Sequence, residues 1–452
     1  MTAEQSQPLG LRILELPGRP DLAAIQAAHP ERYPGLFRTT GTDDGWDILF
    51  AFSQQIDRIS IEKGLHELTQ HPAMRLRPGL SGGNVPSETP TALPFTGGWL
   101  ALFGYELGGL LEPSVGVCAD ESNFPVAWLA RIPAAILLQP SSERCLLLAE
   151  QEYADLMDEM LRDVRKVSAS DGPLPTLDSL KEEEPDLFMH GVTAIQDYIG
   201  AGDVFQVNLS RAWTAMFSKA VSPSALFSRL MTNNPAPFSA LLQFDEQAVV
   251  SSSPERLVRV GRDGSIETRP IAGTHPRGQN PSEDEALRSR LAAHPKERAE
   301  HIMLVDLERN DLGRVCVAGS VRVEALMDIN SYRHVHHIES TIKGTLRPDV
   351  QVFDILRAVF PGGTITGCPK VRAMQIIREL EKSPRQAYTG CIGYINLDGS
   401  LDFNILIRSF QLRGHELGFR AGAGIVADSV ARRELEETRA KARGLLRTLG
   451  VD

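Results

Sequence analysis

A glycine- and threonine-rich stretch at residues 360–370 constrains the fold of this chain more than any other segment. It holds three glycines and two threonines and ends in Pro369-Lys370, after which apolar residues recur at helical spacing. Proline fits the first turn of a helix, so the pattern predicts a tight loop that leads into a helix N-terminus. Such an end presents unpaired backbone N–H groups to an anion, and the hydroxyls of Thr364 and Thr366 would add donors.

The same stretch is not a nucleotide-binding P-loop. Gly362 and Gly367 have the required separation, but Cys368 and Pro369 follow Gly367 where that motif has Lys and Ser or Thr. On its own, the stretch fits a plain helix start as well as it fits an anion site. The rest of the chain therefore has to supply the partners of a site.

Composition narrows the classes of function. The chain has 452 residues, 42% hydrophobic and 23% charged, enough for one large core or two smaller ones. Its net charge is −11 without a basic cluster, which argues against nucleic-acid and anionic-membrane partners. No apolar run is long enough to span a bilayer, the first residues do not resemble a signal peptide, and five scattered cysteines form no CxxC pair. These features predict a cytoplasmic protein with reduced thiols.

The chain divides into two regions at a polar stretch. Residues 11–150 alternate short apolar runs with turns, which predicts a mostly antiparallel sheet with few helices and no catalytic constellation. A charged helix near residues 153–166 is followed by Ser, Gly, Pro and a run of acidic residues up to Pro185, which is typical of a solvated linker or surface loop. We therefore assign residues 1–170 to an N-terminal region and residues 187–452 to a catalytic region.

Three helix starts in the second region carry N-cap patterns. They are Ser222 before Pro223, Ser282 three residues ahead of a glutamate, and Ser429 after Asp428. Each pattern predicts the residue at which a helix begins.

Glutamates of the second region are the first candidates for chemistry. Glu255 directly follows a predicted strand of small residues, where sites form, although a lone glutamate is usually solvated. Glu297 and Glu300 share one face of a predicted helix, and Glu434 and Glu437 share one face of the last helix. Solvated acidic faces are the alternative interpretation of both pairs.

Two such pairs would supply a metal ion with oxygen ligands only. No cluster of Cys and His has the spacing of a zinc site. Carboxylate ligands of this kind favour Mg²⁺ over zinc or iron.

Further features indicate an anionic ligand. The small residues of segment 420–425 let backbone N–H groups approach a carboxylate closely. Arg408 lies in an apolar run, where burying an unpaired guanidinium is costly, so an anionic partner is expected. Together with the acid pairs and the helix N-terminus, these features describe a pocket for a small molecule with more than one carboxylate.

At this density of motifs the chain resembles the chorismate-utilising enzymes. The resemblance covers approximately residues 190–447. Within the first 150 residues, it lies chiefly in residues 95–98 and 104–105. The motifs are 253–255, 270–274, 297–307, 309–313, 335–337, 360–370 and 422–429.

The resemblance implies a fold and a metal site. Antiparallel sheets facing each other in a sandwich, with helices outside, would make this an α+β protein whose active site opens beside the core. Carried over by motif, Glu300 and Glu437 would bind Mg²⁺, and Glu297 and Glu434 would support the ion directly or through water. The metal would hold the ring carboxylate of chorismate.

The resemblance also assigns substrate contacts. Tyr388, Arg408 and the backbone at Gly422 and Gly424 would hold the enolpyruvyl carboxylate, with Lys441 nearby. The expected substrate-binding residues are Ala272, Gly273, Thr274, Tyr388, Arg408, Gly422, Ala423, Gly424 and Lys441.

The expected catalytic residues are Glu255, His337 and Thr364. His337 and Thr364 would line the ring pocket, and Glu255 would protonate the departing 4-hydroxyl as general acid. Hydroxide is a poor leaving group, so both a general acid and a carboxylate stabilised by a cation would be needed to weaken the bond between C4 and the hydroxyl.

Position 272 divides the family, and here it is alanine. The 4-aminobenzoate-type synthases usually carry a lysine there that adds to C2, whereas Ala272 is the anthranilate synthase pattern. Isochorismate and salicylate synthases also use a lysine at this position, so its absence disfavours them. With Ala272, no lysyl adduct can form, and ammonia or water must attack C2 unless C4 is substituted directly.

Other features favour aminodeoxychorismate synthase component I. Several positions match the sequence pattern of that branch: Gly363 after Gly362, residues 335–340, Asn208 and residues 235–238. The chain is also short for an anthranilate synthase, and its start lacks the Leu-Leu-Glu-Ser tryptophan-sensing motif. We expect this branch, with anthranilate synthase component I as the alternative.

Either activity implies a partner. Nothing in the chain resembles a glutaminase nucleophile, so ammonia would come from a separate glutamine amidotransferase. A regulatory relative that binds chorismate or tryptophan without catalysis would be supported by loss of Glu255, Glu300 or Glu437, and all three are present. A purely structural reading of the acidic faces and glycine loops predicts no Mg²⁺-dependent chorismate binding.

Overall fold

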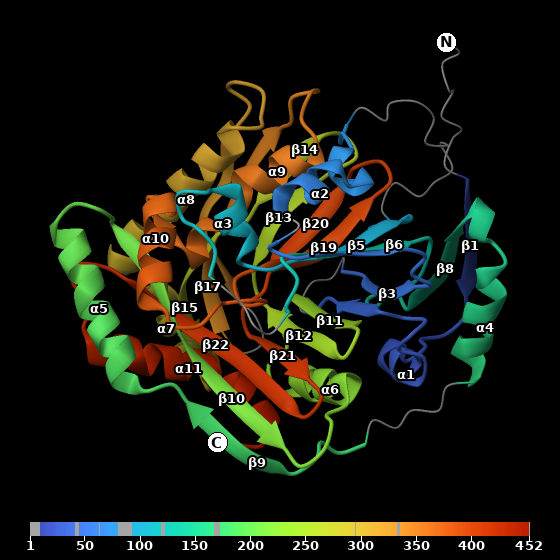
Figure 1. Ribbon diagram of the computed structural model, residues 1–452, viewed down its shortest axis with the longest axis horizontal. Helices are drawn as coiled ribbons and strands as arrows, with labels where there is room; N and C mark the ends of the chain where they lie inside the picture. The colour runs from blue at the N-terminus through green and yellow to red at the C-terminus, as the bar shows by residue number, and fades with distance from the viewer. Residues whose placement is uncertain are drawn as a thin grey trace.

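Two antiparallel sheets form the centre of the computed structural model, and helices cover them (Figure 1). The structure describes residues 10–40, 45–62, 64–79, 93–118, 123–166, 172–293, 295–331 and 335–451, without the side chains of 274–276, 295–296 and 335. The α+β class predicted from the sequence is confirmed. No helix in these ranges is both long and apolar enough to cross a membrane.

The first sheet contains twelve strands within the described ranges. In spatial order they are β1 (Leu11–Leu16), β8 (Arg144–Glu150), β7 (Ala134–Gln139), β3 (Asp47–Ala51), β2 (Gly35–Arg38), β11 (Phe238–Phe244), β12 (Gln247–Ser253), β21 (Ser409–Arg413), β22 (Glu416–Ile425), β10 (Gln206–Phe217) and β18 (Gly367–Cys368), with β9 (Leu177–Glu182) also paired to β10.

The second sheet contains ten strands within the same ranges. Their order is β15 (Ile271–Pro276), β17 (Val335–Thr345), β14 (Ser265–Thr268), β13 (Arg256–Val260), β20 (Leu401–Ile405), β19 (Cys391–Asn396), β5 (Gly98–Phe103), β6 (Ala127–Ile132) and β4 (Ile56–Ile59), with β16 (Arg322–Ser331) paired to β17.

Both sheets combine strands from the two regions of the sequence. β2 pairs with β11 in the first sheet, and β5 pairs with β19 in the second. β9 lies within the stretch predicted as a linker, where it forms an edge strand on β10. The sequence boundary is therefore not a boundary between sheets.

The two sheets face each other across an apolar layer. Phe50 of β3 lies in one buried cluster with Leu100 of β5 and Ile392 of β19, and its ring meets that of Phe95 edge-on at 5.1 Å. The strands at this layer read as continuous apolar runs because both of their faces are covered. At the other extreme, β16 alternates exposed and half-buried residues, as expected of a strand with one solvated face.

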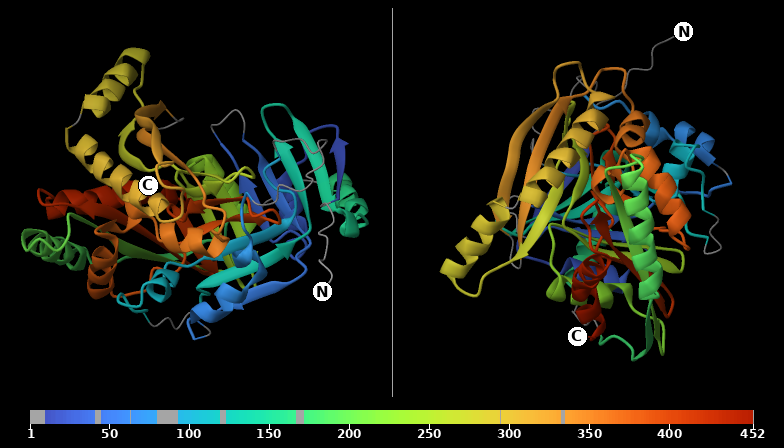
Figure 2. Two further views of the ribbon diagram at one scale, coloured as in Figure 1. Left: turned by 90° about the horizontal axis from the view of Figure 1, so that it is seen from above. Right: turned by 90° about the vertical axis from the view of Figure 1, so that its left-hand side faces the viewer.

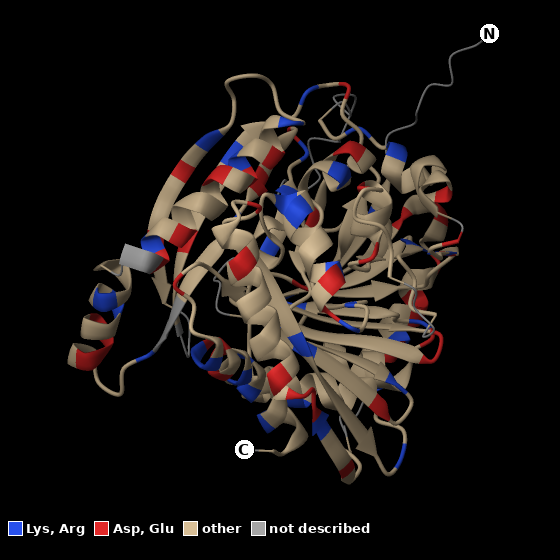
Figure 3. Ribbon diagram, turned by 60° about the vertical axis from the view of Figure 1, so that its left-hand side comes forward, with Lys and Arg blue, Asp and Glu red and all other residues tan. Residues whose placement is uncertain are grey.

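Helices lie outside the sheets. They are α1 (Leu22–Ala28), α2 (Gly64–Gln70), α3 (Leu107–Leu111), α4 (Leu156–Lys166), α5 (Pro185–Gly200), α6 (Pro223–Asn233), α7 (Pro281–Ala293), α8 (Pro295–Gly313), α9 (Val352–Val359), α10 (Lys370–Leu380) and α11 (Ala431–Leu449), with the 3₁₀ turns η1 (Pro72–Arg75), η2 (Gln151–Tyr153) and η3 (Gly363–Ile365). α5, α10 and α11 share a buried cluster with β10 and β22. α7 projects from the body of the molecule beyond α8 (Figures 2 and 3).

One of the three predicted helix starts is confirmed. The Ser222 hydroxyl accepts from the N–H of Ala225 at 3.3 Å, and α6 begins at Pro223. α7 already begins at Pro281, where the side chain of Asn280 accepts from Glu283, so Ser282 is not its cap. α11 has Val430 at its N-cap, because the hydroxyl of Ser429 is taken by the N–H of Val426.

Residues 360–370 form a tight loop before a helix, as predicted, with additional structure inside it. η3 and the short strand β18 precede α10, and Pro369 is the N-cap residue of that helix. The hydroxyl of Thr366 donates to the Gly362 carbonyl at 2.8 Å, so the prediction that Thr366 offers a donor to a ligand is wrong.

Candidate active site

Glu255 is a buried carboxyl at the junction of β12 and β13. Its N–H donates to the Ser253 hydroxyl at 3.2 Å, and its carbonyl accepts from Ile405 at 3.1 Å, so the backbone is fixed on both sides. The residue is 4% exposed, and its Oε1 has no hydrogen-bond partner. Burial raises the pKa of Glu255 to about 7. A substantial fraction therefore carries a proton at neutral pH, as general acid catalysis requires.

Four further segments act on this carboxyl. The Thr364 hydroxyl on η3 and the backbone of Ile271 on β15 lower the pKa of Glu255, and so does Lys441 on α11. The charge of Glu339 on β17 raises that pKa. The structure thus brings Glu255, Thr364 and Lys441 to one place, although they are far apart in the sequence.

His337 lies on β17 opposite the irregular strand β15. The register shifts between Ala272 and Thr274, so that Ala272 pairs with Ile338 and Thr274 with His337. His337 is buried, and burial together with the charge of Arg408 lowers its pKa to about 4. The imidazole is therefore neutral at physiological pH.

Gly273 sits in the bulge between those two pairs. Its φ of +74° lies in the left-handed region, and a Cβ there would come within 2.9 Å of a carboxylate oxygen of Glu297. The backbone of Gly273 also hydrogen-bonds His337. The turn thus brings Gly273, His337 and Glu297 together, while the side chain of Thr274 lies outside the described residues.

Arg408 presents a half-buried guanidinium. Its backbone is left-handed at φ +54°, and its carbonyl accepts from the N–H of Ser252 at 3.1 Å. None of the described carboxylates forms an ion pair with this side chain, and burial lowers its pKa while Tyr388 raises it. A guanidinium held this way is suited to an anionic ligand.

The glycines of β22 leave space that other polar groups fill. A Cβ at Gly422 would lie 2.6 Å from Asn208 Oδ1 and 2.9 Å from the Tyr388 hydroxyl, and a Cβ at Gly424 would lie 2.4 Å from Gln206 Nε2. The buried oxygens Asn208 Oδ1 and Gln206 Oε1 have no hydrogen-bond partner. Buried polar atoms rarely lack a partner in folded proteins, so these two oxygens are candidates for contact with a ligand.

The side chain of Ala423 lies on the opposite face of β22 from the groups that surround Gly422 and Gly424. Its methyl group is fully buried in the cluster that includes Val207 and Leu209, so only its backbone faces the side of the strand where a ligand could bind. Lys441 links α11 to the same strand, since its Nζ donates to the Gly422 carbonyl at 3.0 Å and pairs with Glu437 at 2.8 Å.

The four predicted metal ligands lie on two helices. Glu297 and Glu300 belong to α8, which packs on β15 and β17, whereas Glu434 and Glu437 belong to α11, which packs on β22. Across the described part of the chain, no three His, Cys, Asp or Glu side chains are close enough together to hold a metal ion. As placed here, the four carboxylates do not form a Mg²⁺ site, and the metal assignment stays a prediction.

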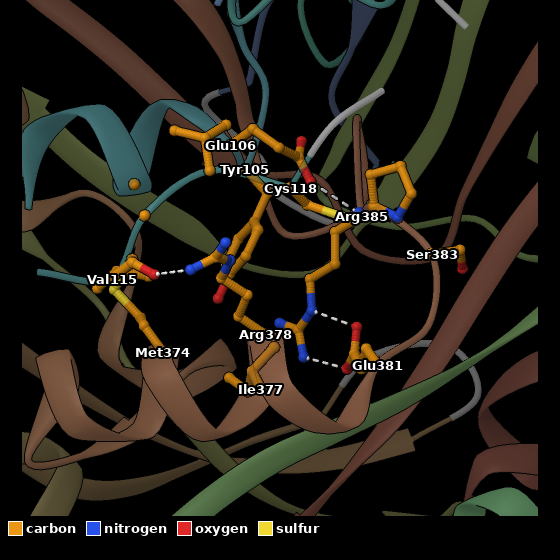
Figure 4. A pocket seen from close by; sticks show the side chains of 14 residues that line it. Tyr105, Glu106, Val115, Cys118, Met374, Ile377, Arg378, Glu381, Ser383 and Arg385 are labelled. Carbon is orange, nitrogen blue, oxygen red and sulfur yellow. Dashed lines mark hydrogen bonds and ion pairs between the residues drawn. The ribbon is translucent and has the colours of Figure 1, made fainter. Parts of the chain in front are cut away.

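A buried ionic network lies beside Asn208 and Tyr388, and sequence reasoning missed it. Glu381 accepts from Arg385 at 2.6 Å and from Arg420 at 3.0 Å (Figure 4 shows the pair with Arg385). Burial alone would raise the pKa of Glu381, but the two guanidiniums lower it. Arg385 also donates to the Asn208 carbonyl at 2.7 Å and lies 5.6 Å from the ring centre of Tyr388. The network therefore fixes the positions of Asn208 and Tyr388.

Comparison with known proteins identifies the family. Residues 36–447 match the family described as chorismate binding enzyme. The chain belongs to the chorismate-binding enzyme family. It is 42% identical over 370 residues to an anthranilate synthase component I-like protein of Synechocystis, covering 81% of this chain and 75% of that protein. It is 39% identical over 379 residues to aminodeoxychorismate synthase component 1 of Bacillus subtilis, covering 80% and 79%.

Solved structures agree with this assignment. Anthranilate synthase component I from Streptococcus pneumoniae superposes with a TM-score of 0.73 at 30% identity, over 98% of this chain and 93% of that one. The menaquinone-specific isochorismate synthase MenF from Escherichia coli has the same fold, with a TM-score of 0.73 at 21% identity over 98% and 96%. The chain is a chorismate-utilising enzyme of the anthranilate or aminodeoxychorismate synthase component I type.

Proposed function

We propose that this chain is a cytoplasmic aminodeoxychorismate synthase component I, which aminates chorismate at C4 on the route to 4-aminobenzoate and folate. Ammonia would come from a separate glutamine amidotransferase. The observation that carries the chemistry is Glu255, a buried carboxyl with an unpartnered oxygen and a pKa of about 7, next to Thr364.

The roles of the side chains follow from their placement. Arg408 and Tyr388 would hold one carboxylate of chorismate, beside the backbone of Gly422 and Gly424. Glu255 would give its proton to the 4-hydroxyl, which leaves as water with the electron pair of the C–O bond. Ammonia would then form the new C–N bond and release one proton, which restores Glu255.

Ala272 restricts how the new C–N bond can form. Its methyl group carries no amine, so no covalent adduct with this side chain can form. We propose that ammonia or water is the C2 nucleophile, unless C4 is substituted directly.

We also propose that the enzyme uses Mg²⁺, because the two pairs of glutamates offer only oxygen ligands, which this ion prefers. The ion would supply positive charge to the ring carboxylate when bound. Among the described residues the four glutamates do not form a metal site, so the proton transfers are assigned to side chains of this chain alone.

The assignment to the C4 branch is supported by the sequence motifs, among them Gly363 after Gly362. Anthranilate synthase component I is the second candidate, and Ala272 is the observation that favours it. The relatives carry both names.

A product assay tests the proposal. The purified chain, given chorismate, Mg²⁺ and an ammonium salt without glutamine, should consume chorismate and yield 4-aminobenzoate only after a lyase is added. Direct appearance of anthranilate fluorescence with pyruvate would assign the chain to the second candidate. No consumption of chorismate would support a non-catalytic regulatory relative.

A further inference from the structure

A recess between α3 and α10 has no part in the proposed reaction. It has a volume of about 420 Å³, its mouth included, and its walls come from segment 105–118, which contains α3, and from segment 374–385, which contains half of α10 (Figure 4). Tyr105 lines it and belongs to the motif at residues 104–105, to which the proposed function gives no role. The volume lies within the range of small-molecule sites, about 300–1,000 Å³.

The hydroxyl of Tyr105 is a buried donor without a partner. The residue is 9% exposed, and no described group forms a hydrogen bond with this hydroxyl. The N–H of Tyr105 donates to the Gln386 carbonyl at 2.8 Å, and the guanidinium of Arg385 lies 4.7 Å from the ring centre, so the ring is fixed in place. Figure 4 shows the hydroxyl pointing toward α10, among the side chains that line the recess.

That hydroxyl is suited to donate to a ligand. Burial raises the pKa of Tyr105, so the hydroxyl keeps its proton at neutral pH. Leaving a buried hydroxyl unpaired costs free energy, which an acceptor atom of a ligand would recover.

Arg378, in the last turn of α10, supplies a second donor to the recess. Its Nη1 donates to the Val115 carbonyl at 2.9 Å, and a Cβ at Gly116 would come within 2.5 Å of the same nitrogen. None of the described carboxylates forms an ion pair with Arg378. A guanidinium carries five N–H donors, so one carbonyl partner leaves donors for a carboxylate.

The charges around the recess favour an anion. Glu381 is paired with both Arg385 and Arg420. Glu106 accepts from two backbone N–H groups of the loop after α10, at 2.8 and 3.0 Å. Both acids therefore have donors from the protein itself, whereas the charge of Arg378 has no described carboxylate to balance it.

The rest of the wall is apolar. Met374 and Ile377 are buried side chains of α10 that line the recess, and Gly109 of α3 adds backbone without a side chain. The thioether of methionine makes favourable contacts with aromatic rings. Donors at one place and an apolar wall beside them match a ligand with one carboxylate and one ring.

We propose that this recess binds a small aromatic monocarboxylate, whose carboxylate accepts from Arg378 and from the Tyr105 hydroxyl and whose ring lies against Met374 and Ile377. Neither Glu255 nor Arg408 lines the recess, so the site is separate from the candidate active site. The proposal does not depend on which reaction the chain catalyses. Benzoate is the simplest member of the class and serves as the probe.

Calorimetric titration of the full chain with benzoate, in the absence of chorismate, tests the site. Benzoate should bind, and acetate, which has no ring to bury, should bind at least about tenfold more weakly. Tyr105→Phe should raise the Kd for benzoate at least about tenfold, because a hydrogen bond to a charged group is lost. Tyr198→Phe, whose hydroxyl donates to Glu379 outside the recess, is the matched control and should keep the wild-type Kd.

Two further variants keep the test decisive. Arg378→Gln should raise the Kd for benzoate at least about tenfold and replaces Tyr105→Phe if that variant does not fold. Arg408→Gln should leave the Kd unchanged, because Arg408 belongs to the candidate active site.

Three results would overturn the proposal. They are no binding of benzoate at millimolar concentration, a wild-type Kd in both Tyr105→Phe and Arg378→Gln, and a Kd that Arg408→Gln raises as much as Tyr105→Phe does, since benzoate would then occupy the candidate active site. The titration involves no turnover, so it gives its answer whether the chain aminates chorismate at C4, at C2 or not at all.

Discussion

At the scale of single residues, the sequence singled out Glu255 and Arg408 as candidates for the site. Glu255 was recognisable because it follows a strand of small residues, and the structure finds it buried with a raised pKa. Arg408 was recognisable as a charge in an apolar run. Glu381 and Arg385 were not, because a glutamate and an arginine four residues apart look like any exposed helix pair until the fold buries them against Arg420.

Glu255→Gln should reduce the rate of chorismate consumption by roughly 10²–10⁴-fold, because the amide has no proton to give the leaving hydroxyl. Substrate KM should change little. Glu246→Gln, at the exposed turn between β11 and β12, is the control and should be active. Near-normal turnover by Glu255→Gln would remove Glu255 from the mechanism.

Gly422→Ala should lower stability by about 1–3 kcal/mol and weaken chorismate binding, because the new methyl group would collide with Asn208 and Tyr388. Gly418→Ala, on the same strand in open space, is a matched control. Urea unfolding and KM for chorismate measure both effects. If the two variants have the same stability and the same KM for chorismate, the close packing at Gly422 affects neither property.

At the scale of elements, the sequence predicted some helices and strands but not which strands pair with each other. The glycine loop and the start of α6 follow from local chemistry, so local patterns predicted them. β9 was read as linker because its edge position leaves it polar, and pairing with β10 is a long-range contact. The position of α8 relative to α11 also depends on contacts between distant parts of the sequence. The two pairs of glutamates could therefore suggest a metal ion, but not where the two helices lie.

Glu437→Gln should raise the Mg²⁺ concentration needed for half-maximal turnover at least about tenfold if α8 and α11 share an ion, since each carboxylate ligand adds to the affinity. Glu436→Gln, the adjacent exposed glutamate paired with Arg439, should have the wild-type Mg²⁺ requirement. The metal dependence of the initial rate distinguishes the two. Equal Mg²⁺ curves for both variants would exclude Glu437 as a ligand.

The whole molecule is organised by sheets that cross the sequence boundary. Strands before residue 170 lie inside both sheets, between or beside strands of the catalytic region. The sandwich class was predictable from the family resemblance. The interleaving was not, because apolar runs in residues 11–150 show that strands form and do not show with which strands they pair.

A fragment of residues 187–452 should therefore not fold by itself. β11 would lose β2, and β19 would lose β5, which leaves long apolar strand edges and half of the inter-sheet cluster exposed. Differential scanning calorimetry should show a cooperative transition for the full chain and none for the fragment. A cooperative transition of the fragment, with chorismate raising its Tm, would show that the catalytic region is independent.

The central claim is amination at C4 of chorismate, and the most direct measurement is the structure of the first product. NMR of a reaction of the full chain with chorismate, Mg²⁺ and ammonium, quenched early, locates the new C–N bond. The account predicts an amine at C4 with the enolpyruvyl group retained. An aromatic amine at C2 with free pyruvate would contradict it.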